Sequence, residues 1–267
     1  MLSCLVGSEM CIRDSGRSYG DSCLNDEGTL LEAKFLNRLI SFDEKKGLLK
    51  AEAGVSLEQI IDFCLPKGWF LPVSPGTKFV TLAGAIANDI HGKNHHTAGT
   101  FGCHVKAIEL LRSDGKRYLC TEELHPELFC ATIAGLGLTG LILSAEIQLK
   151  KVDNAFLDAE YIQFESFDEF FELSAASDKD YEYTVSWLDS LNTGGKGIFI
   201  RGNHASKDAK LPKKPGKKAI PIPINFPEFA LNRYSVAAFN KLYFHKQFSK
   251  EKKLIQHYDP FFYPLDS

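Results

Sequence analysis

The sequence predicts a fold of mixed strands and helices, of the α/β or α+β class. Short apolar segments separated by turn residues alternate with helical patterns as far as residue 150. Beyond that point aromatic side chains become frequent and further strand-like segments follow. We therefore place a domain boundary near residue 151, with one domain in residues 16–150 and a second in residues 151–267.

The first elements are a strand, a hairpin and a helix. Residues 29–35 form an apolar run, and residues 39–42 and 47–51 flank a charged turn like the two arms of a hairpin. Ser56 begins a helix because Gln59 completes a capping box, and the apolar residues after them fall on one face. A proline and a glycine then end this helix.

A second hairpin and a long strand complete the first domain. Residues 105–111 and 116–120 flank an Asp-Gly turn, and residues 126–133 indicate a short helix. A glycine-rich turn at 135–140 leads into an apolar strand over 141–149. This turn contains GxGxxG, but a Rossmann dinucleotide site needs that motif after a strand and at the start of a helix. The order of elements here argues against a Rossmann site.

The second domain begins with a strand over residues 156–164. Ser166 and Glu169 then cap a helix that carries several phenylalanines. Residues 183–188 and 197–201 indicate a pair of strands. This part of the chain is therefore expected to contain a sheet with a helix packed on it.

The composition sets limits on function. Hydrophobic residues make up 44% of the chain, which suffices for a sizeable core. With 31 basic and 34 acidic residues there is no chain-wide attraction to nucleic acid, so any anion site must be local. No apolar stretch approaches the roughly 20 residues of a membrane-spanning helix. The lysine-rich run at 207–218 is typical of a mobile surface loop, with a loop that faces phosphate or a membrane surface as the alternative.

The cysteines indicate the cellular compartment of the protein, and the first fifteen residues bear on where the native chain starts. Seven cysteines in no paired spacing favour reduced thiols and a cytoplasmic protein. Residues 1–15 lack the basic start and the uninterrupted apolar core of a signal peptide. We interpret them as a non-native leader translated in frame from a cloning adaptor, so the native N-terminus would be missing.

The most distinctive stretch is 81–96, where a helix start of small residues precedes a loop crowded with ionisable side chains. Thr81 stands at the N-cap position, and free N–H groups at such a helix start favour a pyrophosphate. A helix packed tightly against a sheet is the alternative. Residues 16–21 join two glycines, an arginine and hydroxyl groups, which suits a loop around phosphate as well as an ordinary loop.

Four histidines, at 91, 95, 96 and 104, invite a metal interpretation, with acidic and thiol side chains nearby. Their spacing matches no compact zinc pattern, and glycines interrupt the segment. We therefore expect no metal and favour histidines that are structural or that face a substrate.

Five motifs, taken together, resemble one protein family. In order and spacing they are similar to the PCMH-type FAD-binding domain of the vanillyl-alcohol-oxidase-like flavoprotein oxidoreductases. The His-Gly-Lys-Asn-His-His pattern is similar to the branch of that family that oxidises polyprenyl-phosphate sugars. The motifs are Gly-Arg-Ser-Tyr-Gly-Asp at 16–21, Ser-Pro-Gly-Thr at 74–77, the run at 80–96, Ala-Gly-Thr-Phe-Gly at 98–102 and Gly-Leu-Thr-Gly at 137–140.

This resemblance implies a two-lobed α+β FAD-binding domain, truncated at its N-terminus, followed by a partial antiparallel-sheet substrate domain. It implies FAD as the cofactor, held without a covalent bond. The residues that would bind FAD follow the diphosphate loop, the helix start at 81 and the strand after the third glycine turn. They are Gly16, Arg17, Ser18, Tyr19, Gly20, Asp21, Gly76, Thr77, Thr81, Leu82, Ala83, Gly84, Asn88, Asp89, Ile90, His91 and Ile142.

The resemblance also implies an enzyme. It would oxidise a secondary alcohol of a sugar or polyprenyl-phosphate sugar by hydride transfer to flavin N5, with His91 and Lys93 facing the substrate. The general base has no assignment. A role in making a cell-wall arabinan precursor would follow, together with a partner reductase that completes an epimerisation. The location would be cytoplasmic, peripheral to the inner membrane.

Two other functions stay open. One is an aldonolactone or alditol oxidase that passes electrons to oxygen, and the other is a non-catalytic module that binds sugar phosphates. The family pattern continues beyond residues 263–266, so the lysine and tyrosine that the family places beside the flavin are absent. We therefore expect a fragment, truncated at both ends, that binds FAD weakly or does not turn over.

Overall fold

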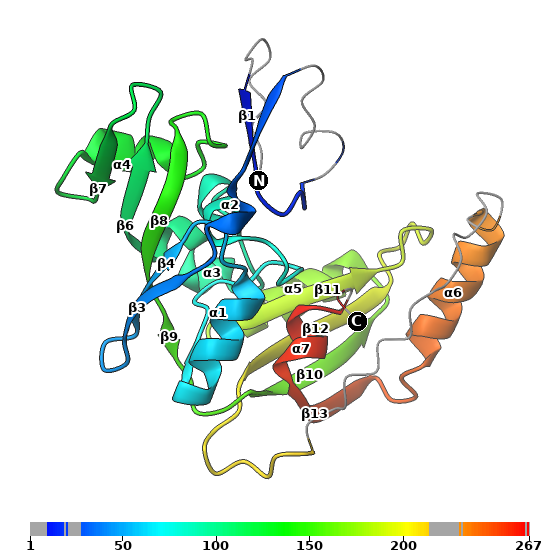
Figure 1. Cartoon of the computed structure of the whole chain (residues 1–267). Coiled ribbons are helices and arrows are strands. Elements are labelled where there is room, and N and C mark those ends of the chain that lie inside the picture. The colour runs from blue at the N-terminus through cyan, green and yellow to red at the C-terminus, as the bar shows by residue number, and fades with distance from the viewer. Residues whose placement is uncertain are drawn as a thin grey trace. The chain divides into compact units, whose positions relative to one another are not determined.

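The computed structural model describes residues 10–18, 20, 28–213, 230, 232–264 and 266 (Figure 1). They divide into two compact units, one that reaches Val152 and one that begins at Asp153. Each unit combines helices with an antiparallel sheet, so the α+β class is confirmed. The change of composition near residue 151 lies beside this division.

A five-stranded antiparallel sheet organises the first unit. β3 (Leu39–Asp43) and β4 (Leu48–Glu52) are the first predicted hairpin. β6 (Val105–Leu111) and β7 (Arg117–Cys120) are the second. β8 (Leu141–Gln148) lies between the two hairpins and pairs with β4 and β6. The strand order is therefore β3-β4-β8-β6-β7.

The predicted strand over residues 29–35 is right only in its first half. β2 (Thr29–Glu32) is a strand, but a 3-10 helix, η1 (Ala33–Phe35), follows it because the chain turns here toward Gly54. The N–H of Gly54 donates to the carbonyl of Leu36 at 2.6 Å. The other short strands pair as β1 (Met10–Arg13) with β2, in parallel, and β5 (Trp69–Phe70) with β9 (Lys150–Lys151), antiparallel.

The first helix, α1 (Leu57–Cys64), begins as the sequence predicts. Ser56 and Gln59 complete a capping box, and the apolar residues of the helix face the core. A 3-10 turn, η2 (Leu65–Lys67), and Gly68 with a φ of +78° end it, because glycine takes the left-handed conformation without a steric penalty. The other helices described in this unit are α2 (Leu82–Ala87), α3 (His95–Ala98), η3 (Phe101–His104) and α4 (Pro126–Thr132).

The second unit has a four-stranded antiparallel sheet. β10 (Phe156–Phe164) has the predicted bounds, and β11 (Tyr183–Leu188) pairs with β12 (Gly197–His204) as predicted. β12 also pairs with β10, and β13 (Glu251–His257) lies on the other side of β10. The strand order is β11-β12-β10-β13.

Helix α5 (Phe167–Ser177) packs on this sheet. Ser166 caps it by accepting the N–H of Glu169 at 3.1 Å, as predicted. Phe170 and Leu173 of the helix pack against a small core of sheet residues formed by Ile162, Phe164 and Phe199. Among the described residues this unit also contains the helices α6 (Arg233–His245) and α7 (Tyr258–Phe262).

None of the helices in the described ranges is long and apolar enough to cross a membrane. The cysteines within those ranges form no disulfide. Burial raises the pKa of the Cys64 thiol to about 12, so this side chain stays protonated and acts as a small apolar residue.

Candidate functional site

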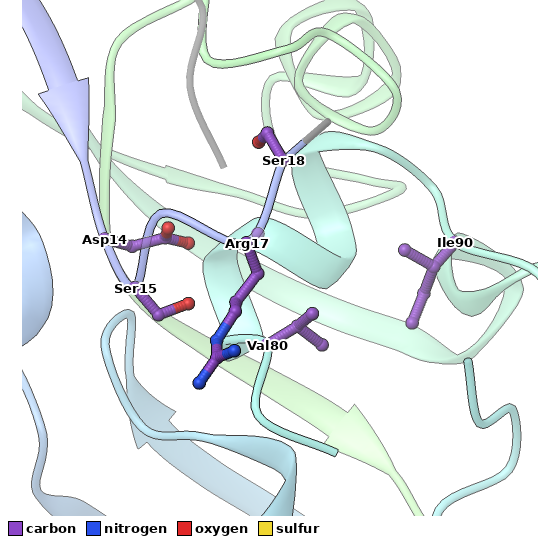
Figure 2. A pocket seen from close by; sticks show the side chains of 7 residues that line it. Asp14, Ser15, Arg17, Ser18, Val80 and Ile90 are labelled. Atoms are coloured by element: carbon purple, nitrogen blue, oxygen red, sulfur yellow. The ribbon is translucent and has the colours of Figure 1, made fainter. Parts of the chain in front are cut away.

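A pocket brings three separate segments of the first unit together. Arg17 and Ser18 come from the loop after β1, Gly84 from α2, and Ile90 from the loop after that helix. Figure 2 shows Arg17 extending toward Val80. The pocket has a volume of about 30 Å³, far below the roughly 300–1,000 Å³ of small-molecule sites, so it suits only a small part of a larger ligand. Asp14, Ser15 and Val80 complete its lining.

Thr81 connects the two main sides of this pocket. Its side-chain oxygen accepts the N–H of Gly84 at 3.0 Å, which makes it the predicted N-cap of α2. Its hydroxyl also donates to the carboxylate of Asp14, in the loop that carries Arg17 and Ser18. The cap therefore ties the helix start to that loop.

The first N–H groups of α2 are not free, so the prediction of an open helix start was wrong. The N–H of Leu82 donates to the carbonyl of Val55 at 2.8 Å, and that of Ala83 donates to the carbonyl of Ala53 at 2.9 Å. These acceptors lie in the segment just before α1, which runs antiparallel to the start of α2. An anion in the pocket must therefore find other donors.

Two side chains at the pocket can act as such donors. The hydroxyl oxygen of Ser18 is buried and has no hydrogen-bond partner among the described residues. A buried polar group left in this state costs about 1–3 kcal/mol, which a ligand acceptor would remove. The Arg17 guanidinium lies 5.4 Å from the centre of the Phe79 ring, a contact that leaves its N–H groups available for a carboxylate or a phosphate.

A strained turn lies against the end of α2. The N–H of Ala134 donates to the carbonyl of Ile86 at 3.1 Å, and that of Leu136 donates to Ala87 at 2.8 Å. Ala134 and Leu136 have φ values of +59° and +51°, which cost roughly 1–2 kcal/mol for residues with a Cβ. The predicted site residues do not include this turn. Its three closely spaced glycines were the signal that the backbone here is unusual.

Asn88 and Asp89 hold the loop that follows α2. The side-chain amide of Asn88 donates to the carbonyl of Gly84 at 2.7 Å. The carboxylate of Asp89 accepts the N–H of Gly102 at 2.7 Å, and Asp89 itself has a φ of +44°. Both side chains therefore shape the loop, while Ile90 is the residue of the predicted run 88–91 that lines the pocket.

The loop that carries Lys93 is fixed by the segment before it. A Cβ at Gly92 would lie 2.7 Å from the carbonyl oxygen of Ser74, so the two backbones touch here. The side-chain amide of Asn94 donates to the carbonyl of Pro72 at 2.9 Å. Lys93 lies half-buried between these contacts, and burial lowers the pKa of its ammonium group. An anionic ligand would stabilise this poorly hydrated cation.

The histidines form an exposed group and one structural member. The rings of His91 and His95 have centroids 6.3 Å apart, and those of His95 and His96 are 5.9 Å apart. The Nε2 atom of His104 makes a hydrogen bond with the carbonyl of Ala98 at 3.0 Å, and burial lowers the pKa of this imidazole. Within the part of the chain that the structure describes, no three His, Cys, Asp or Glu side chains gather in a way that could hold a metal.

Most of the other predicted FAD-binding residues do not line the pocket. Gly20 and Gly76 are exposed, and a Cβ added to either would meet nothing within 4 Å. Leu82 and Ile142 are buried in the core, so their side chains contact the protein itself. Gly16, Thr77, Thr81, Ala83, Asn88, Asp89 and His91 are also outside the lining, and Tyr19 and Asp21 lie outside the described residues.

Comparison with known families decides the nature of this unit. A family model described as the FAD binding domain matches residues 7–121. The chain contains an FAD binding domain. FAD is the cofactor of this domain, and every residue that lines the pocket lies within the match. The match begins at residue 7, inside the segment 1–15 interpreted as a leader, and Met10–Arg13 of that segment forms β1.

The chain is similar in sequence to several named enzymes. The chain is 38% identical over 272 residues to decaprenylphosphoryl-beta-D-ribose oxidase of Mycolicibacterium smegmatis, which covers 97% of this chain and 59% of that protein. It is 29% identical to an Arabidopsis thaliana protein named as an L-gulonolactone oxidase, over 65% of this chain and 33% of that protein. It is 30% identical to Delta(24)-sterol reductase of Homo sapiens, over 42% of this chain and 22% of that protein. The chain thus spans 59% of the first relative and less of the other two.

Proposed function

We propose that the complete gene product is an FAD-dependent oxidoreductase that oxidises a secondary alcohol of a polyprenyl-phosphate sugar. The observation that carries this proposal is the pocket in which Arg17, Ser18 and Gly84 converge inside the FAD binding domain. The similarity to decaprenylphosphoryl-beta-D-ribose oxidase supports the substrate class, because it extends over 97% of the chain and so includes the second unit.

The pocket would hold the diphosphate of FAD. Arg17 has a permanent charge and a fork of N–H donors that matches phosphate oxygens. The buried hydroxyl of Ser18 would gain the acceptor that it lacks among the described residues. Gly84 has no side chain and allows a ligand to approach the helix closely. Since the first N–H groups of α2 are already bonded, these side chains would carry the anion.

The remaining FAD contacts in this proposal follow the motif resemblance. The flavin ring would lie along residues 88–91, next to Ile90 of the pocket lining, and FAD would be held without a covalent bond. The domain would have the two lobes of the PCMH type. The further residues of the proposed cradle are Gly16, Tyr19, Gly20, Asp21, Gly76, Thr77, Thr81, Leu82, Ala83, Asn88, Asp89, His91 and Ile142.

The chain's own residues would bind and orient the substrate. When bound, FAD supplies the acceptor for the hydride of the alcohol. The ammonium group of Lys93 would pair with the substrate phosphate or with an oxyanion, which compensates the burial that lowers its pKa. The exposed imidazole of His91 would hydrogen-bond to a sugar hydroxyl.

The same proposal includes a substrate domain, a partner enzyme and a cellular location. The antiparallel sheet of the second unit would form part of a substrate domain. A partner reductase would complete an epimerisation of the oxidised sugar in the making of a cell-wall arabinan precursor. The protein would be cytoplasmic and would work at the inner membrane as a peripheral protein, because a polyprenyl tail resides in a bilayer.

Variants at the histidines test these roles in the complete gene product loaded with FAD. His91→Ala should keep its flavin through gel filtration and slow the bleaching of flavin absorbance by polyprenylphosphoryl ribose under anaerobic conditions. His95→Ala removes a neighbouring exposed imidazole that has no role in the proposal, and it should bleach at the normal rate. Equal rates in the two variants would remove His91 from the site.

The choice of substrate separates the proposal from its alternatives. Bleaching by aldonolactones alone would favour a lactone oxidase, which the similarity to the Arabidopsis protein makes the second candidate. Bound flavin that no sugar alcohol or lactone reduces would favour a module that binds sugar phosphates without turnover. Bleaching by polyprenylphosphoryl ribose supports the proposed function.

A further inference from the structure

Helix α6, orange in Figure 1, has an unusual composition and a well-defined start. Its 13 residues include no aspartate or glutamate, although the whole chain has 34 acidic residues. Asn232 caps the helix by accepting the N–H groups of Tyr234 and Ser235. The helix is therefore a fixed element with a surface free of negative charge.

The inner face of α6 is anchored to the second unit. The side-chain amide of Asn240 donates to the carboxylate of Asp189 at 2.6 Å. The ring centroids of Tyr243 and Trp187 are 4.8 Å apart, and the side chain of Phe244 is buried. These contacts fix the rotation of the helix, so the opposite face must point to solvent.

The outer face of α6 presents large exposed apolar side chains, with the exposed Ser235 and His245 as its polar members. Tyr234 is 84% exposed and Leu242 is 74% exposed. With Ala238 they recur every four residues, which places all three on one stripe of the helix. Phe239 beside the stripe and Phe248 just after the helix are exposed as well. Exposed apolar side chains that gather in this way mark an interaction surface.

Positive charges border this stripe. Lys241 and Lys246 are exposed, and neither forms an ion pair with an acidic side chain in the described ranges. Helix α5 of the same unit offers a contrast, since it exposes Phe171 to 63% but carries Asp168 and Glu169 in its first turn. Of these two helices, α6 alone combines exposed apolar side chains with lysines and has no acidic residue.

We propose that the outer face of α6 docks on an anionic phospholipid bilayer. The side chains of Tyr234 and Leu242 would enter the headgroup region, and the lysines would meet the anionic headgroups. A second copy of the chain fits less well, because packing α6 against α6 would bring the lysines of both helices together. The inference rests on the proposed function, because a polyprenyl-phosphate substrate would have to be reached at a bilayer.

Flotation of the FAD-loaded complete gene product with lipid vesicles tests this inference. The vesicles contain phosphatidylcholine alone or phosphatidylcholine with phosphatidylglycerol. We expect binding to the mixed vesicles only, and weaker binding at high salt. Leu242→Ser should lower the affinity about tenfold, because that is the effect of no longer burying one leucine. The double change Lys241→Glu and Lys246→Glu should lower it by at least as much.

Phe171→Ser on α5 is the matched control, since it removes a similarly exposed apolar side chain from an acidic helix. It should leave vesicle binding unchanged. Circular dichroism confirms that each variant folds, which is expected because every change is at an exposed residue. Absence of binding to the mixed vesicles, or a Leu242→Ser variant that binds as tightly as the wild type, would overturn the inference.

Two further results separate this inference from others. A dimer that dissociates on Leu242→Ser, without any vesicle binding, would overturn it and assign the face to a second copy. A protein that retains no flavin but binds vesicles through α6 would support this inference. The same result would contradict the proposed function.

Discussion

The side-chain oxygen of Thr81 accepts the N–H of Gly84 at 3.0 Å, while the Thr81 hydroxyl donates to Asp14. One hydroxyl group thus fixes both the start of α2 and the loop that carries Arg17 and Ser18. The position of the pocket depends on this connection, because its lining comes from both segments.

Thr81→Val should therefore destabilise the protein. Valine keeps the shape of threonine but cannot cap the helix, and loss of an N-cap costs about 1 kcal/mol of unfolding free energy. Thr81→Ser keeps the hydroxyl and should stay close to the wild type. Urea unfolding followed by circular dichroism measures the difference. If the valine and serine variants were equally stable, the hydrogen bonds of Thr81 would not matter for stability.

Arg17→Ala should weaken FAD binding about tenfold, the effect expected when one charge-assisted hydrogen bond to phosphate is lost. Quenching of FAD fluorescence on titration measures the affinity. Arg117→Ala on β7 removes another exposed arginine of the same unit and is the matched control. If both variants bound FAD as tightly as the wild type, Arg17 would have no place in the diphosphate site.

Ser18→Ala should lower the affinity for FAD without lowering the stability of the FAD-free protein. Without FAD, removing a buried hydroxyl that has no described partner should leave the unfolding free energy unchanged or raise it by up to about 1 kcal/mol. With FAD, loss of the same hydroxyl should lower the affinity severalfold. Urea unfolding and fluorescence titration of one preparation give both values. A clear loss of stability without FAD would show that the hydroxyl already has a structural partner.

Gly92→Ala should disturb the loop that carries Lys93. The added Cβ would lie 2.7 Å from the carbonyl oxygen of Ser74, and backbone atoms cannot move away cheaply. We expect a loss of about 1–3 kcal/mol in unfolding free energy and slower bleaching of the flavin by substrate. Gly76→Ala is the control for stability alone, because a Cβ there meets nothing within 4 Å. Equal stability of the two variants would contradict the close contact at Gly92.

Lys93 should make the stability of the FAD-free protein depend on pH. Burial lowers its pKa below the ordinary value of 10.5, so the unfolded chain binds more protons than the folded protein between the lowered pKa and 10.5. Stability from this group therefore rises with pH across that window. Lys93→Met should raise the unfolding free energy at neutral pH and flatten the rise. Urea unfolding at several pH values tests this, with the exposed Lys106→Met as control, and a rise unchanged in Lys93→Met would contradict it.

Local patterns in the sequence predicted most of the elements correctly. The capping box of Ser56 and Gln59, the N-cap Thr81 and both hairpins of the first unit depend on residues that are close in sequence. These residues interact within one turn of helix or one loop, so contacts with distant parts of the chain do not change the local structure that they favour. The exception is the run at 29–35, where a contact with Gly54 turns the chain after Glu32.

Contacts between distant segments could not be predicted in this way. β8 inserts between the two hairpins because it pairs with strands far from it in sequence. The carbonyls of Val55 and Ala53 accept the first N–H groups of α2. The sequence pattern at 81–87 gives no sign of these hydrogen bonds. Arg17, Ser18, Gly84 and Ile90 of the predicted segments line one pocket, but the first N–H groups of α2, which the sequence predicts to be free, are already bonded.

The visible absorbance spectrum of the FAD-loaded complete gene product, before and after anaerobic addition of polyprenylphosphoryl ribose, tests the proposed function most directly. The proposed function predicts flavin bands that elute with the protein on gel filtration and lose intensity when the sugar is added. A protein that elutes colourless after reconstitution, or one whose flavin bands no sugar alcohol changes, would contradict it.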